Sequence, residues 1–283
     1  MSIKPWKELT IADDYMFKRV MSNKEICKKM LEKILQVKIH DIKYLEEEKV
    51  LQPSYENKGI RLDVYVEDDK NTVYDVEMQV SNPGVDELAA RVRYYQAMID
   101  VEHLSKGEPY TKINETFIIF ICLFDPFGSG RHCYPFHSWC DVEKDLKLPE
   151  KITKVFLNTK GTKDDVLEDV QAFLHYIAGH LSEDAFVQTV HEEVKALRRS
   201  KWERANYMFF EEKLQAERNK GFVEGEKKGL AEGEKKGLAE GEKKTEVRMQ
   251  KLINKLAMAK RFDDLADMAD STKLKALYAE FDI

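Results

Sequence analysis

The chain has 283 residues, enough for one large or two modest domains, and 43% of them are hydrophobic, enough for a buried core. The N-terminal stretch MSIKPWKELT lacks the apolar segment of a signal peptide, and the longest apolar run, Phe117–Phe124, is far shorter than the roughly 20 residues of a membrane span. The four cysteines are irregularly spaced, which favours a reducing compartment. We therefore expect a cytoplasmic protein that makes no membrane contact.

The net charge of −6 argues against a protein that coats nucleic acid over its whole surface. The charge is uneven, however. Residues 195–260 contain 18 Lys and Arg against 11 Asp and Glu, a net charge of +7, so the rest of the chain carries −13. Because affinity for phosphate comes from local basic groups, this distribution still permits a nucleic-acid substrate.

Residues 10–36 are predicted to form two helical segments, with Thr10 and Asn23 as their N-caps. Asp14 falls in the first turn of the first segment. The helix dipole favours an acid there for structural reasons alone, and a role beside a substrate is the alternative. After these helices, the loosely alternating stretch Val37–Leu51 is predicted to be the first strand.

The stretch Arg61–Val80 is predicted to be a hairpin of two strands, because apolar and polar residues alternate along both halves. The turn between them, Asp68–Asn71, consists of residues that tolerate a chain reversal. This arrangement gathers three polar residues on one face of a sheet: Asp63, Glu77 and Gln79.

Two carboxylates on neighbouring strands can hold a hard divalent cation, because Mg²⁺ prefers oxygen ligands and takes only one or two protein carboxylates beside water and phosphate. Such a cation lowers the pKa of a bound water and screens charge on a phosphate oxygen. Gln79 would lie beside Glu77 and could orient the attacking water. The same alternation is also the usual pattern of a solvent-exposed strand face, and the residues alone leave both interpretations open.

Four short motifs occur in an order that resembles the PD-(D/E)xK nuclease superfamily, in particular the Rpn (YhgA-like) family of recombination-promoting nucleases and transposases. They are Asp14-x-x-Phe17-Lys18, Arg61-x-Asp63 followed by Glu77-x-Gln79-Val80-Ser81, Arg91-x-x-x-Tyr95, and Tyr134-x-Phe136. The resemblance covers residues 10 to about 200. Leu62 stands in place of the superfamily's Pro and Gln79 in place of its Lys, the latter being usual in the Rpn-like branch.

The resemblance implies a restriction-endonuclease-like α/β core of order α-β-β-β-α-β, with a mixed central sheet flanked by helices, and a long helical C-terminal region. It implies a metal-dependent DNA endonuclease linked to recombination. The expected cofactor is Mg²⁺, with Mn²⁺ or Ca²⁺ as alternatives. The expected metal ligands are Asp63 and Glu77, Gln79 is the third catalytic residue, and Asp14 is a candidate on the substrate side. Arg91 and Gln96 lie near the polar side of the helix predicted over Val85–His103 and could bind a phosphate of the substrate, with a plain exposed Arg as the alternative. Two alternatives stay open: a catalytically inactive nuclease-fold scaffold that binds proteins, and an RNA-directed nuclease.

The elements after the hairpin are read from periodicity and from turn residues. A helix is predicted over Val85–His103, strands over Glu115–Phe124 and Lys151–Asn158, and helices over 163–180 and 183–218. A zinc site is an alternative for one short window between them, where compact spacing and interleaved aromatic residues instead favour core packing: His132, Cys133, His137 and Cys140.

Residues 221–244 repeat a four-residue unit with glycine at every fourth position from Gly221 to Gly241. Glycine favours a flexible linker, but Glu and Lys between the glycines form helices well, so we expect one long helix that could self-associate. The expected division is a nuclease-like core over 1–160, a helical extension over 161–218, the repeat over 219–245 and C-terminal helices over 246–283.

Overall fold

The computed structural model describes residues 4–52, 56 and 58–283. The chain divides into two compact units, Met1–Phe209 and Phe210–Ile283, which are described separately. The first unit contains all six strands of the described residues: β1 (Ile42–Leu51), β2 (Ile60–Asp68), β3 (Val73–Gln79), β4 (Thr116–Cys122), β5 (Cys133–Phe136) and β6 (Ile152–Asn158).

These strands form one mixed sheet in the order β1-β2-β3-β4-β6-β5. The first three strands are antiparallel, β3, β4 and β6 run parallel, and β5 returns antiparallel along β6. Strand β4 is central and almost wholly apolar, as expected for a parallel strand that is covered on both faces.

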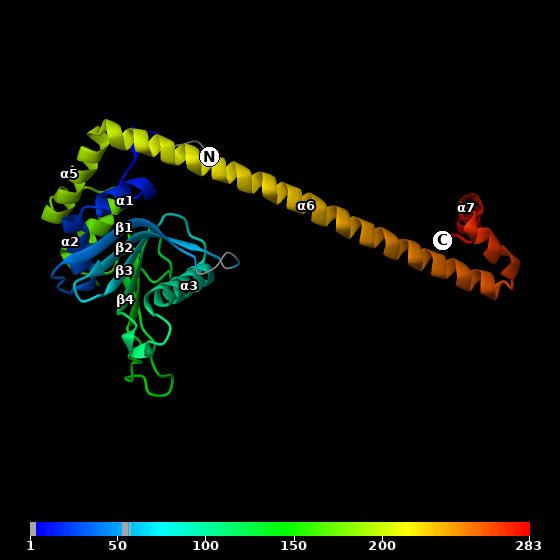
Figure 1. Cartoon of the computed structure of the whole chain (residues 1–283), viewed down its shortest axis with the longest axis horizontal. Helices are drawn as coiled ribbons and strands as arrows, with labels where there is room; N and C mark the ends of the chain where they lie inside the picture. The colour runs from blue at the N-terminus through cyan, green and yellow to red at the C-terminus, as the bar shows by residue number, and fades with distance from the viewer. Residues whose placement is uncertain (1–3, 53–55, 57) are drawn as a thin grey trace. The chain divides into compact units, whose positions relative to one another are not determined.

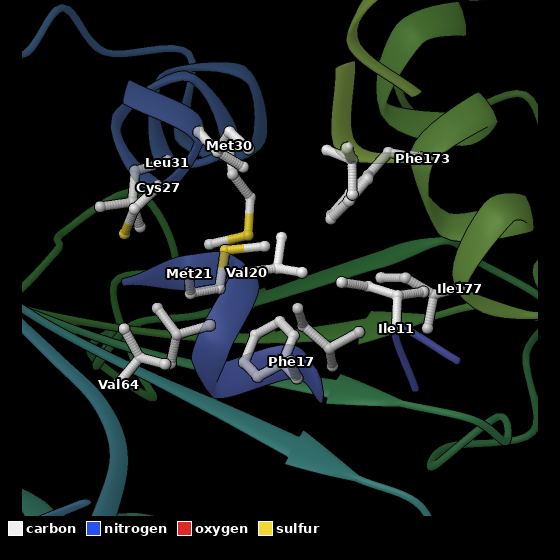
Figure 2. Packing of buried hydrophobic residues seen from close by; sticks show 14 of the residues in the cluster. Ile11, Phe17, Val20, Met21, Cys27, Met30, Leu31, Val64, Phe173 and Ile177 are labelled. Atoms are coloured by element: carbon white, nitrogen blue, oxygen red, sulfur yellow. The ribbon is translucent and has the colours of Figure 1, made fainter. Parts of the chain in front are cut away.

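Helices cover both faces of this sheet. One face packs against α1 (Asp14–Met21), α2 (Lys24–Leu35), α4 (Glu168–Ile177) and α5 (Ala185–Arg199), through a core that includes Phe17, Met30 and Phe173 (Figure 2). The other face packs against α3 (Val85–His103), which lies on the opposite side of the sheet from α1 and α2 (Figure 1). The order α-β-β-β-α-β and the restriction-endonuclease-like α/β class are therefore confirmed.

Local sequence explains how the first helices are placed. Asn23 caps α2 as predicted, because its side-chain oxygen accepts hydrogen bonds from the backbone N–H groups of Glu25 and Ile26 at 3.2 and 3.4 Å. Helix α1 begins at Asp14 rather than at Thr10, and Thr10 instead donates through its backbone and hydroxyl to Asp13. The carboxylate of Asp14 therefore stands in the first turn of α1, beside the end of the sheet where β2 begins.

The second unit begins within α6, which runs from Lys201 to Met258 and continues through a 3-10 segment (Phe262–Ala269) to α7 (Ser271–Glu280). The glycine repeat lies inside α6, so the structure has the helix that we predicted and not the linker. The end of α6 and α7 share a small apolar cluster: Leu252, Leu256, Leu277 and Tyr278.

Several boundaries differ from the sequence prediction. The edge strand β5 was missed, because its four residues do not alternate in burial. The expected helix over 183–218 is two helices, since α5 ends at Arg199 and Ser200 has an extended backbone (ψ 119°) before α6 starts. No helix among the described residues has both the length and the apolarity to cross a bilayer.

Candidate active site

Strands β2 and β3 separate at the residues that the sequence singled out. Their pairing runs from Glu67–Val73 to Val64–Val76 and stops before Asp63 and Glu77. Beyond that point, hydrogen bonds from backbone amides to the side chains of Asp63 and Glu77 take the place of backbone-to-backbone hydrogen bonds. The backbone N–H of Asp63 donates to Glu77 Oε1 at 2.7 Å, and the backbone N–H of Met78 donates to Asp63 Oδ2 at 3.1 Å. Each carboxylate thus binds a backbone amide of the other strand, which holds the two acids side by side.

The second oxygen of each acid faces a positively charged side chain. Asp63 Oδ1 lies 3.2 Å from Nζ of Lys18, which comes from α1. Glu77 Oε2 lies 3.5 Å from Nη2 of Arg91, which comes from α3. Helices on opposite faces of the sheet therefore each supply one cation to the end where β2 and β3 part.

Burial and mutual repulsion control the ionisation of these acids. Burial raises the pKa of the Asp63 carboxyl, although Lys18 lowers it in part. Burial raises the pKa of the Glu77 carboxyl well above its usual range, and repulsion from Asp75 and Asp63 adds to the effect. For Lys18, burial alone would lower the pKa, but Asp63 and Asp14 raise it above its usual value. The site therefore keeps Lys18 positive and makes the acids costly to ionise without a cation.

A cleft of about 790 Å³ opens beside the two acids. Its lining combines Asp63 and Glu77 with basic and aromatic side chains, and two further acids, Asp14 and Glu87, also contribute to it. The basic and aromatic members are Lys58, Arg61, Arg91, Arg93, Tyr94 and Tyr95. Because a phosphodiester is anionic and its bases are flat, this lining suits a nucleic-acid strand beside the acids.

The remaining predicted site residues lie at different distances from this centre. Gln79 is the last residue of β3, and its Oε1 accepts a hydrogen bond from Arg91 Nη1 at 2.7 Å while its Nε2 donates to the carbonyl of Ser81. Gln96 does not line the cleft, and its side chain is hydrogen-bonded to Asp100 on the same helix. The structure thus brings five predicted residues together and leaves Gln96 aside.

Three site residues were missed by the sequence analysis: Lys18, Glu48 and Asp75. Glu48 has a left-handed backbone (φ 58°), and its carboxylate lies 2.9 Å from Lys18 Nζ. Asp75 is fully buried, and its carboxyl interacts with that of Glu77 while no N–H donor among the described residues bonds to it. Asp75 precedes Glu77 by two residues on the same strand face, and that spacing is the one signal that could have found it.

The zinc alternative has no support in the described residues, where no three or more His, Cys, Asp or Glu side chains are grouped as metal ligands. His132 is instead fully buried, and its Nδ1 lies 2.7 Å from the carbonyl of Lys163 and 3.2 Å from Asp165 Oδ1. It packs closely on the loop that follows β6, because a Cβ at Gly161 would lie 2.4 Å from its ring.

A family model described as PD-(D/E)XK nuclease family transposase matches residues 11–178, which include every residue of the centre described above. The chain belongs to this family. Searches of curated proteins and of solved structures gave no match. Membership confirms the resemblance drawn from the sequence and indicates a nuclease, a hydrolase of phosphodiester bonds.

Nucleases of the PD-(D/E)XK type generally use divalent metal ions. The described residues contain no group of three or more His, Cys, Asp or Glu ligands, but the pair Asp63 and Glu77 fits an ion that takes two protein carboxylates. Asp63 and Glu77 offer hard oxygen ligands. Burial, and repulsion between neighbouring acids including the buried Asp75, raise their pKa values, and a bound cation would offset this cost of ionising them. With Asp63 and Glu77 as the protein ligands, water and phosphate would complete the coordination.

Proposed function

We propose that this protein is a metal-dependent endonuclease that hydrolyses phosphodiester bonds of DNA in recombination or transposition. The observation that carries the proposal is the reciprocal bonding of Asp63 and Glu77 across the parted ends of β2 and β3, beside a cleft that places basic side chains next to these acids. Mg²⁺ is the proposed ion, with Mn²⁺ or Ca²⁺ as alternatives.

In this proposal each residue of the centre has one role. Asp63 and Glu77 hold the cation, which when bound supplies Lewis-acid chemistry to water and to the phosphate. Gln79 orients the attacking water, and Arg91 binds a phosphate oxygen beside it, because the two side chains already share a hydrogen bond of 2.7 Å. Hydrolysis joins the water oxygen to phosphorus and releases the leaving oxygen as a hydroxyl group.

Asp14 and Gln96 are the proposed contacts at the edges of the substrate. Asp14 lines the cleft, and its carboxylate is held 2.7 Å from Lys18 Nζ. Gln96 would reach the substrate from outside the cleft lining, on the same helix as Arg91. Of the six proposed site residues, Gln96 therefore has the weakest geometric support.

A plasmid-nicking assay with Mg²⁺ or Mn²⁺ tests this function. The isosteric changes Asp63→Asn and Glu77→Gln keep the oxygens that accept from Met78 and Asp63, so the fold should survive them. We expect each change to slow cleavage at least about 100-fold, since each removes several kcal/mol of charge stabilisation and 1.4 kcal/mol is worth a factor of ten. The matched control is Glu67→Gln, a partly exposed acid on the same strand, which should cleave like the wild type.

The outcomes separate the alternatives. Equal nicking by the wild type and both site variants would mean that the activity does not come from this centre. Absence of nicking in every protein, with DNA and with RNA substrates, would favour the inactive scaffold. Cleavage of RNA alone, lost in both variants, would keep the centre and change the substrate.

A further inference from the structure

Lys18 is exceptional in this chain because its ammonium group is buried among carboxylates. Among residues 4–52, 56 and 58–283, no other lysine or arginine is buried. Nζ of Lys18 lies 2.7 Å from Asp14, 2.9 Å from Glu48 and 3.2 Å from Asp63. An ammonium has three N–H donors, so these three carboxylates can satisfy all of them. Burial of a lysine costs hydration and side-chain freedom, and this placement therefore calls for a specific role.

The position of Lys18 matters because the oxygens of the acidic pair are not equivalent. Asp63 Oδ2 and Glu77 Oε1 are bonded to backbone amides of the neighbouring strand. The oxygens left for a cation are Asp63 Oδ1, which faces Lys18, and Glu77 Oε2, which faces Arg91. A divalent cation that binds this pair therefore meets a fixed positive charge beside the Asp63 oxygen that it needs.

We propose that Lys18 is the internal counter-ion of the metal site, a residue that pairs with Asp63 before the cation binds and weakens the affinity for that cation, while the backbone amide of Met78 holds Asp63 in place. This inference rests on the proposed function of the site. When Asp63 binds the cation, Lys18 keeps two other carboxylate partners, Asp14 and Glu48. The ammonium then remains buried beneath Asp14 and Asp63, which line the cleft.

Metal affinity distinguishes a counter-ion from a purely structural lysine. A structural lysine would leave Asp63 disordered on removal, so Lys18→Met would bind the cation more weakly. A counter-ion competes with the cation, so Lys18→Met would bind it more tightly. The arginine variant Lys18→Arg keeps the charge and is expected to bind nearly as the wild type does.

The experiment is a titration of the full chain with Mn²⁺ alone, without nucleic acid, in which electron paramagnetic resonance reports free Mn²⁺. We expect Lys18→Met to lower the dissociation constant on the order of tenfold, because it removes a like charge a few ångströms from the cation. The matched control is Lys33→Met, a lysine of α2 that pairs with Asp169 outside the cleft, which should leave the affinity unchanged. Thermal melting monitored by circular dichroism shows whether each variant is folded.

A second variant covers the case in which Lys18→Met does not fold. Glu48→Gln removes one alternative partner of Lys18, holds the ammonium on Asp63, and should weaken Mn²⁺ binding several-fold. If folded Lys18→Met binds Mn²⁺ with unchanged or weaker affinity, the counter-ion role is overturned. Unchanged or tighter binding by Glu48→Gln would overturn it as well. In both cases, Mn²⁺ binding by the wild type would leave the proposed function standing. Failure of the wild type to bind Mn²⁺ would overturn both.

Discussion

Asp75 is a single residue whose buried carboxyl is unfavourable for folding and lies beside the Asp63–Glu77 pair. The side chain is fully buried on β3, and in the described part of the chain its carboxyl meets the carboxyl of Glu77 but no N–H donor. Burial raises the pKa of the Asp75 carboxyl well above its usual range, and repulsion from Asp63 raises it further. A buried acid that lacks its own partner costs stability, and such groups are typically retained for function.

The substitution Asp75→Asn is expected to stabilise the metal-free protein at neutral and higher pH. A carboxyl whose pKa is raised on folding stabilises the fold below the ordinary carboxyl range, about pH 4, and loses that contribution as pH rises toward the raised value. Because asparagine does not titrate, we expect a gain on the order of 1–3 kcal/mol in unfolding free energy at pH 8 that shrinks toward pH 4.

Thermal melts of the metal-free chain across this pH range measure the effect of Asp75→Asn. The control is Asp141→Asn, whose side chain is fully exposed and should leave the melting temperature unchanged at each pH. A loss of stability at pH 8 would mean that the ionised carboxylate of Asp75 has a partner in solution.

At the scale of elements, some features are readable from sequence because local pattern determines them. The helix predicted over Val85–His103 has the bounds of α3, and the alternation in β2 and β3 identified both strands and both acids. The parting of those strands could not be read, because it depends on the side chain of each acid bonding the opposite backbone. Lys18 was missed as a site residue since lysine is ordinarily exposed and its partner Asp63 is 45 positions away along the chain.

Helix α6 forms although the glycines in its sequence disfavour a helix. Its repeat makes a continuous helix although it contains six glycines, each of which costs roughly 0.8–1 kcal/mol relative to alanine. An added Cβ at Gly229 or Gly233 would meet no atom within 4 Å. Within this unit alone, then, the glycines have no packing role, and self-association through them stays a prediction.

The double substitution Gly229→Ala with Gly233→Ala should raise the helicity of a peptide covering residues 216–260, because it removes about 1.6–2 kcal/mol of unfavourable propensity. Far-UV circular dichroism over a range of concentrations measures this. The control, Ala231→Gly in the same repeat, should lower helicity by a comparable step. Helicity that depends on concentration in the parent peptide and is lost in the double variant would instead show that glycines pack between copies.

At the scale of the whole molecule, the uneven charge now has a structural context. Of the net charge of +7 over residues 195–260, α6 itself carries only +3, from 14 Lys and Arg against 11 Asp and Glu, and the rest comes from Lys195, Arg198, Arg199 and Lys260. The acids of the centre belong to the remainder of the chain, which carries −13. The acids of the centre are offset locally by Arg91 and Arg61 in the cleft and by the buried Lys18 beside Asp63. The composition of the chain is compatible with a phosphate-binding surface. The location of that surface depends on tertiary contacts between α1, β2, β3 and α3, which composition does not give. The division at residues 160, 218 and 245 stays a prediction.

The measurement that tests the account most directly is the stoichiometry of metal binding in the wild type and in two isosteric variants. Calorimetric titration of the full chain with Mn²⁺ should show one site in the wild type, and either Asp63→Asn or Glu77→Gln alone should abolish it, because the two acids share one cation. Glu67→Gln should bind like the wild type. Retention of wild-type affinity by folded Asp63→Asn or folded Glu77→Gln would contradict the claim that these two side chains form a single site.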